Sequence, residues 1–150
     1  MPIDLRLPPY NVKGDWSDNG SAIQDAANFY GLGNGTHPDN GGAVGETLML
    51  PAGSVVSGKI TLPPGIALQG ANDYATTLVK SSSVTGEMDF VQGGDPAGLY
   101  ASFGGALRHM NVWCSKTEEA SGSVAAVRMT SVQDGTILDH VRIYGFKRRA

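Results

Sequence analysis

The chain repeats the stretch Leu107-Arg108-His109-Met110-Asn111-Val112-Trp113 as Leu138-Asp139-His140-Val141-Arg142-Ile143-Tyr144. Both stretches follow one pattern: leucine, any residue, histidine, apolar, polar, apolar, aromatic. Another short apolar run, Ala125-Ala126-Val127-Arg128-Met129-Thr130, lies between them. A repeat interrupted by a further strand is typical of stacked coils, in which equivalent positions lie one strand spacing, roughly 4.8 Å, above each other.

Regular alternation along the two repeats divides their side chains between an inner and an outer face. The inner, apolar set is expected to be Leu107, Met110, Val112, Leu138, Val141 and Ile143. The outer set is expected to be Asn111, Trp113, Arg142 and Tyr144.

The repeat also predicts contacts at the bend that its spacing implies. Arg108 and His109 would lie directly beneath Asp139 and His140. This arrangement predicts an ion pair between Arg108 and Asp139 and stacking of His109 on His140. Such pairs between neighbouring strands on a surface stabilise the fold by about a few tenths of a kcal/mol each.

The outer face allows two other interpretations. It could bind sugars, with Trp113 and Tyr144 as apolar platforms and Arg142, Asn111 and Asp139 as polar contacts. The two aromatic residues could equally pack against a neighbouring subunit.

The first half of the chain adds one helix and a series of very short strands. Residues 1–13 form a proline-containing, extended lead-in. Ser21 to Gln24 fit a capping box, and apolar residues at helical spacing follow until Gly31: Ile23, Ala26, Ala27 and Tyr30. Short β-type runs with Gly and Pro corners come next, at residues 47–50, 54–56, 59–62, 66–69 and 77–79. Alone they fit hairpins or a solenoid; the later repeat favours the solenoid.

Two segments resemble the opening of pectate-lyase-like right-handed parallel β-helices. Residues 12–24, with Gly14-Asp15 and Ala22-Ile23-Gln24, are similar to the family signature Gly-Asp-Gly-x-Thr-Asp-Asp-Thr-x-Ala-Ile-Gln, but Trp16 replaces its second glycine and the segment is one residue shorter. Residues 50–80 follow the family's first coils, with Leu50-Pro51-Ala52-Gly53 and Leu62-Pro63-Pro64-Gly65 before strands. The resemblance implies an all-β parallel β-helix with a short capping helix over residues 14–150.

Several residues have a structural interpretation within this resemblance. A helix laid over the first coil would hide its apolar bore and its unpaired strand edge. Asp15 and Asp18 are expected to accept hydrogen bonds from backbone N–H groups rather than to act in catalysis. The remaining cap and turn positions are Gly14, Ser21, Gln24, Pro51, Gly53, Gly65 and Gly70.

Composition excludes several classes of protein. Hydrophobic residues make up 41% of the chain and charged residues 17%, which indicates an ordered domain. A net charge of −3 argues against nucleic acid as the main partner, although Lys147-Arg148-Arg149 form one basic cluster. The single cysteine, Cys114, rules out an intrachain disulfide. No run approaches the ~20 apolar residues of a spanning helix, and no secretory signal is recognisable.

Catalytic candidates are sparse. Glycoside hydrolysis needs a carboxylate pair, and lyase chemistry needs a base beside an acidic sugar. Asp134 and Asp139 are the close carboxylates of the repeated region, with His140 as a possible partner, whereas Glu118-Glu119 fall in a polar stretch. His37 has no partners at ligand spacing, so no metal site and no cofactor are expected.

Three functions remain open from the sequence. The resemblance and the missing signal favour a phage tailspike or tail-fibre component, located in the virion, that binds bacterial surface polysaccharide. Such a component would be a homotrimer and would contact other tail proteins. The alternatives are a polysaccharide lyase or glycoside hydrolase, and a structural adaptor in a larger assembly. Because the last coil has no recognisable cap, we expect either a longer chain or another chain to cover it.

Overall fold

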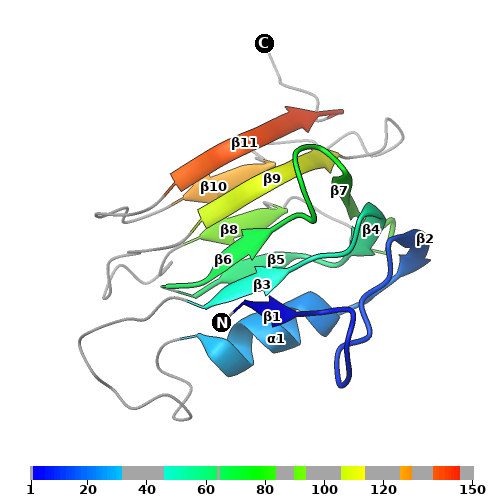
Figure 1. Ribbon diagram of the computed structural model, residues 1–150. Helices are drawn as coiled ribbons and strands as arrows, with labels where there is room; N and C mark the ends of the chain where they lie inside the picture. The colour runs from blue at the N-terminus through cyan, green and yellow to red at the C-terminus, as the bar shows by residue number, and fades with distance from the viewer. Residues whose placement is uncertain are drawn as a thin grey trace.

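Parallel β-strands make up most of the described chain in the computed structural model (Figure 1). The structure describes residues 2–31, 46–63, 65–83, 90–93, 106–113, 126–129 and 137–145. The strands in these ranges are β1 (Ile3–Asp4), β2 (Asp15–Asp18), β3 (Thr47–Met49), β4 (Gly53–Ser57), β5 (Ile60–Leu62), β6 (Ala67–Gln69), β7 (Thr76–Lys80), β8 (Val91–Gly93), β9 (Ala106–Trp113), β10 (Val127–Met129) and β11 (Ile137–Tyr144). The helix is α1 (Ala22–Tyr30).

The strands form three columns of parallel pairs. The first column runs β1-β3-β6-β9, the second runs β2-β4-β7-β9, and the third runs β5-β8-β10. The first half of β9 pairs with β6 and its second half with β7, so the first two columns join into one curled sheet. Figure 1 shows β11 above β9, with which it pairs along its length. The mostly parallel β class with one short helix is confirmed.

Equivalent residues lie directly above one another in the core. Leu48 pairs with Leu68, and Leu68 pairs with Leu107; all three side chains are fully buried. Met110 and Val112 are fully buried as well, which confirms the inner set on β9. Each such side chain contributes roughly 1.5–3 kcal/mol through burial.

The matching residues of β11 are less buried. Leu138 stands over Leu107 and Ile143 over Val112, yet they are 51% and 46% exposed. Val141 is partly buried and packs against the core. The exposure arises because no strand among the described residues pairs with the other edge of β11.

Helix α1 covers the opposite end of the stack, where Figure 1 shows it below the strands. The predicted apolar stripe is confirmed: Ile23, Ala26 and Ala27 are buried, and Tyr30 packs against the core. Leu5 and Val12 of the lead-in are buried in the same core. Among the described residues, no helix has the length and apolar character needed to cross a membrane.

The predicted capping box at the start of α1 is wrong. The Ser21 side chain makes no cap bond and instead donates to Oδ2 of Asp25 at 2.9 Å. Gln24 turns toward β5, where its Oε1 accepts from the Thr61 N–H at 2.5 Å and its Nε2 donates to the Thr61 carbonyl at 2.8 Å. The helix start is exposed and can bond to water, whereas the edge of β5 at Thr61 is half buried, and there the Gln24 amide takes the place of a neighbouring strand.

Several of the predicted turn residues lie where two backbone segments come very close together. Ser54 N–H donates to the Gly14 carbonyl at 2.8 Å, and a Cβ at Gly53 would overlap that same carbonyl oxygen. Gly53 also has a φ of 98°, which side chains disfavour. At Gly70 a Cβ would overlap the His109 carbonyl oxygen. Gly65 has a positive φ of 81°, and the Pro51 carbonyl accepts from Thr76 Oγ1 at 2.7 Å.

Replacing Gln24 with Met should destabilise the fold by about 2 kcal/mol, because both polar groups of Thr61 lose their partners while the side-chain volume is kept. Urea unfolding followed by circular dichroism measures this change. Asn28→Met removes the second acceptor of the Gln24 amide, which lies 2.8 Å from Nε2, but leaves both contacts with Thr61 in place. It is the matched control and should cost well under half as much. Equal unfolding midpoints for the two variants would contradict the role of Gln24.

Gly53→Ala and Gly20→Ala separate backbone strain from steric overlap. Both glycines have positive φ, 98° and 55°, but nothing lies within 4 Å of a Cβ at Gly20. Gly20→Ala should therefore cost about 1 kcal/mol, and Gly53→Ala at least about 3 kcal/mol because the strands must also move apart. The comparison of unfolding midpoints tests this difference, and similar values would show that the close contact does not constrain the fold.

Candidate functional site

Histidines form the corner at which β9 and β11 bend. His109 and His140 have positive φ values of 54° and 50°, a left-handed conformation that His adopts more readily than most residues. The two rings are stacked, with centroids 5.2 Å apart and planes inclined by 19°. The predicted stacking of His109 on His140 is confirmed, and we call this place the histidine corner.

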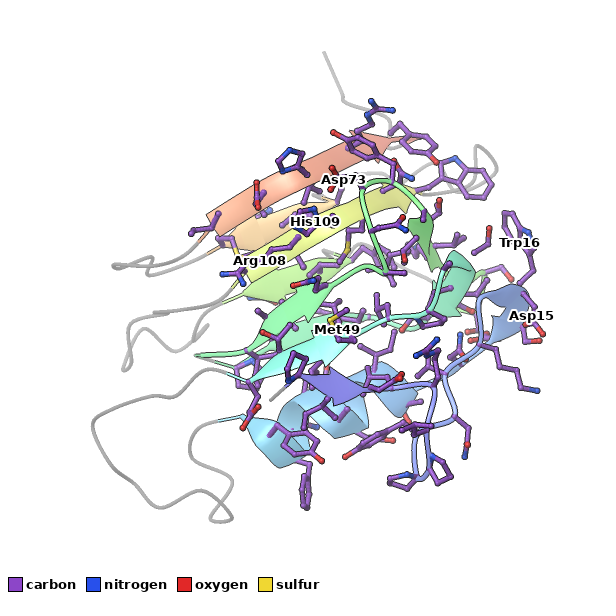
Figure 2. All side chains as sticks on the ribbon, in the orientation of Figure 1. Asp15, Trp16, Met49, Asp73, Arg108 and His109 are labelled. Atoms are coloured by element: carbon purple, nitrogen blue, oxygen red, sulfur yellow. The ribbon has the colours of Figure 1, made fainter. Side chains whose placement is uncertain are left out.

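Two carboxylates flank the histidine corner. The carboxylate of Asp73 contacts Nδ1 of His109 (Figure 2). Oδ1 of Asp139 lies 2.7 Å from Nδ1 of His140, and its Oδ2 lies 3.9 Å from Nε2 of His109. Both carboxylates are about half exposed, so water screens these pairs.

The predicted ion pair of Arg108 with Asp139 does not form among the described residues. The two residues are in register on β9 and β11, as expected. The bend, however, places both imidazoles beside the Asp139 carboxylate, which turns to them instead. Register alone therefore gave the right neighbours but the wrong pairing of charges.

A short loop between β6 and β7 folds over this corner and carries Asp73. The side chain of Asn111 donates to the Tyr74 carbonyl at 3.0 Å, and Gly70 N–H donates to the Arg108 carbonyl at 2.9 Å. Asn111 is only 8% exposed, so the prediction that it lies on the outer surface is wrong. The loop covers it, and its amide holds the loop in place.

A shallow depression of about 440 Å³ lies beside the histidine corner. Its lining residues are Gln69, Asn72, Asp73 and His109. The depression is open to solvent and has a mixed polar lining, which suits a small polar ligand or an ion more than a large apolar one.

Three aromatic side chains form a second feature, which we call the aromatic row. Trp113 is in register with Tyr144, as the repeat predicted, and their ring centroids are 6.5 Å apart. Trp16 of β2 meets Trp113 edge to face at 5.6 Å. Trp16 and Tyr144 are 59% and 47% exposed. Sequence reasoning did not select Trp16; the signal was an aromatic residue where the resembled pattern has glycine.

Arg142 lies next to the aromatic row on β11. Its guanidinium carbon is 3.7 Å from the centroid of the Tyr74 ring, and the side chain is exposed. Such cation–π contact fixes the direction of the guanidinium while its N–H groups stay available. The predicted outward position of Arg142 is therefore confirmed.

The edge strand that carries Trp16 is held by two aspartates. Asp15 Oδ1 accepts from Ser17 N–H at 3.0 Å, and Asp18 Oδ1 accepts from Gly20 N–H at 2.8 Å. These contacts confirm both residues as turn acceptors. Asp18 Oδ2 also accepts from Ser81 Oγ at 2.5 Å. The Ser81 hydroxyl, with the Gly20 N–H, lowers the pKa of Asp18.

The remaining candidates have different outcomes. Asp139 and His140 lie together at the histidine corner, as described above. Asp134, Glu118-Glu119, His37 and Cys114 lie outside the described residues. Asp73 was not among the sequence candidates, because nothing in its own neighbourhood indicates a contact with a strand that comes much later in the chain.

The lowered pKa of Asp18 predicts a specific acid response. Because this pKa is lower in the folded than in the unfolded chain, ionised Asp18 stabilises the fold above about pH 4, and this stabilisation is lost as the pH falls through the folded value. Asp18→Asn should cost about 1 kcal/mol at pH 7, and the difference from wild type should shrink on acidification. Urea unfolding at pH 7, 5 and 3 measures this difference in the free energy of unfolding. Ser81→Ala should also lose less stability, relative to wild type, at low pH than at pH 7. A constant difference across this range would refute the assignment.

Comparison of the chain with protein-family models, curated proteins and solved structures finds no match. The function therefore has to be argued from the residues of this chain. Two features are available for that argument: the aromatic row and the histidine corner.

Proposed function

We propose that the chain is the capped first part of a right-handed parallel β-helix in a phage tailspike or tail-fibre component, and that its aromatic row binds bacterial surface polysaccharide. Virion location, trimeric assembly and contact with other tail proteins belong to this proposal. They follow from the resemblance of residues 12–24 and 50–80 to pectate-lyase-like proteins.

The strand pairing supports the β-helix part of the proposal. Strands β3, β4 and β5 each pair in parallel with the strand three places further along the chain. A chain that winds through three strands per coil produces this regular offset. The position of α1 against β5 also agrees with a cap on the first coil.

The aromatic row is the observation that carries the binding proposal. Sugar rings have apolar faces, and exposed Trp and Tyr rings provide flat apolar surfaces with little side-chain entropy to lose. The ring planes of Trp113 and Tyr144 are tilted by only 32°, so the two rings form one apolar strip. Trp16 adds a third apolar ring, which meets Trp113 edge to face at 87°. Arg142 stands beside it with N–H donors suited to hydroxyl or carboxylate groups of an acidic glycan.

A catalytic role is the second candidate, and the histidine corner favours it. Asp139 touches one imidazole and lies near a second, and Asp73 pairs with His109. Carboxylates and imidazoles so close together can exchange protons with a bound substrate, as polysaccharide lyases and hydrolases require. Asp139→Asn should abolish any such cleavage while the protein stays folded.

Removing single rings of the aromatic row tests glycan binding. Trp113→Ala, Tyr144→Ala and Trp16→Ala should each weaken binding to a recognised bacterial capsule or O-antigen polysaccharide by roughly tenfold. Phe29→Ala is the matched control, because Phe29 is 50% exposed on α1 and should not affect binding. Affinity electrophoresis against a panel of polysaccharides gives the ratio of variant to wild-type dissociation constants. Unchanged binding in all three variants would show that the aromatic row is not the glycan-binding surface.

The assembly is tested on the same protein. Light scattering at several concentrations should give the mass of a trimer. A stable monomer would contradict the trimeric part of the proposal and favour a free sugar-active domain, which the release of reducing ends would then reveal.

A further inference from the structure

We propose that Asp73, His109 and His140 bind a divalent transition-metal ion, with Zn²⁺ as the best match. Each residue offers one ligand atom, and the three atoms lie within 4.8 Å of one another. The inference stands independently of glycan binding, because it uses the histidine corner and not the aromatic row.

The donor set fits such an ion by its chemistry. Two imidazole nitrogens and one carboxylate oxygen are typical zinc ligands, whereas Ca²⁺ and Mg²⁺ prefer oxygen ligands alone. The carboxylates of Asp73 and Asp139 also make the corner negative when both imidazoles are neutral, and this charge favours a cation. Three protein ligands leave a position for water, as in open zinc sites.

The geometry requires only small side-chain movements. Zinc bonds of about 2.0–2.2 Å place tetrahedral ligand atoms roughly 3.3–3.5 Å apart. The Asp73 carboxylate, which contacts Nδ1 of His109, would have to move away from that nitrogen, while His140 would have to close in. The side chains of Asp73 and His140 are 54% and 53% exposed and can rotate. The side chain of His109 is only 30% exposed, so it has less freedom to rotate than the other two ligands.

The backbone around the site is already held in place. His109 and His140 stack on the paired strands β9 and β11, and both adopt the left-handed bend. Asn111 holds the Tyr74 carbonyl, which fixes the loop beside Asp73. Preorganisation of this kind lowers the entropic cost of ion binding.

Asp139 has the role of a positioning residue in this site. Its Oδ1 lies 2.7 Å from Nδ1 of His140, which leaves Nε2 of that ring to ligate the ion. A carboxylate on the second nitrogen fixes the orientation of a ligating imidazole and raises its basicity. The ion itself would join the loop between β6 and β7 to β9 and β11.

Calorimetric titration of the chelator-treated protein with ZnCl₂ tests the proposal. We expect saturable binding of a single ion per chain and a higher melting temperature in its presence. Asp73→Asn, His109→Asn and His140→Asn should each weaken binding by about 100-fold, and Asp139→Asn by about tenfold. Asn is chosen at both histidines because it tolerates a positive φ.

His37→Asn is the matched control, since His37 is the remaining histidine of the chain. It should bind Zn²⁺ like the wild type, and excess CaCl₂ should not displace the ion. Circular dichroism without metal checks that each variant is folded; should a histidine variant not fold, Asp73→Asn, in an exposed loop, still decides the question. Absence of saturable binding, unchanged affinity in Asp73→Asn, or loss of binding in His37→Asn would each overturn the proposal.

Discussion

In-register parallel pairing is the constraint on which the rest of the structure depends. It places each residue one strand spacing, roughly 4.8 Å, from its equivalent in the next strand. Inside, this stacks Leu48, Leu68 and Leu107 into a buried column. At the corner and on the outside, the same rule stacks His109 on His140 and sets Trp113 beside Tyr144. The core and both candidate sites therefore have one geometric origin.

A stack of parallel strands has to satisfy the backbone groups of its end strands. At one end, Gln24 meets this need for β5, because its amide offers both an N–H donor and a carbonyl acceptor, as a peptide group does. At the other end, β11 pairs on one edge only, and Leu138 and Ile143 stay half exposed. The protein thus has one covered end and one apolar end within the described residues.

The loop between β6 and β7 couples the two candidate sites. Asp73 reaches the histidine corner, while Tyr74 supports Arg142 beside the aromatic row. The side chain of Asn111 donates to the Tyr74 carbonyl and so holds the loop that carries Asp73 and Tyr74. Movement of this loop would therefore alter the ion site and the proposed glycan surface together. A bound ion would restrain it, because the ion ties Asp73 to two neighbouring strands.

Features that repeat or that have local chemistry could be predicted from the residues alone: the short strands, the apolar stripe of α1, the glycine turns, and the neighbours of His109 and Trp113. The folded chain was needed to show the role of Gln24, the burial of Asn111, the pairing of Asp73 and the place of Trp16. These four residues act across segments that are far apart in the chain and have no common period. Local preference and periodicity describe a strand and its equivalents, but which loop folds over which strand depends on packing in three dimensions.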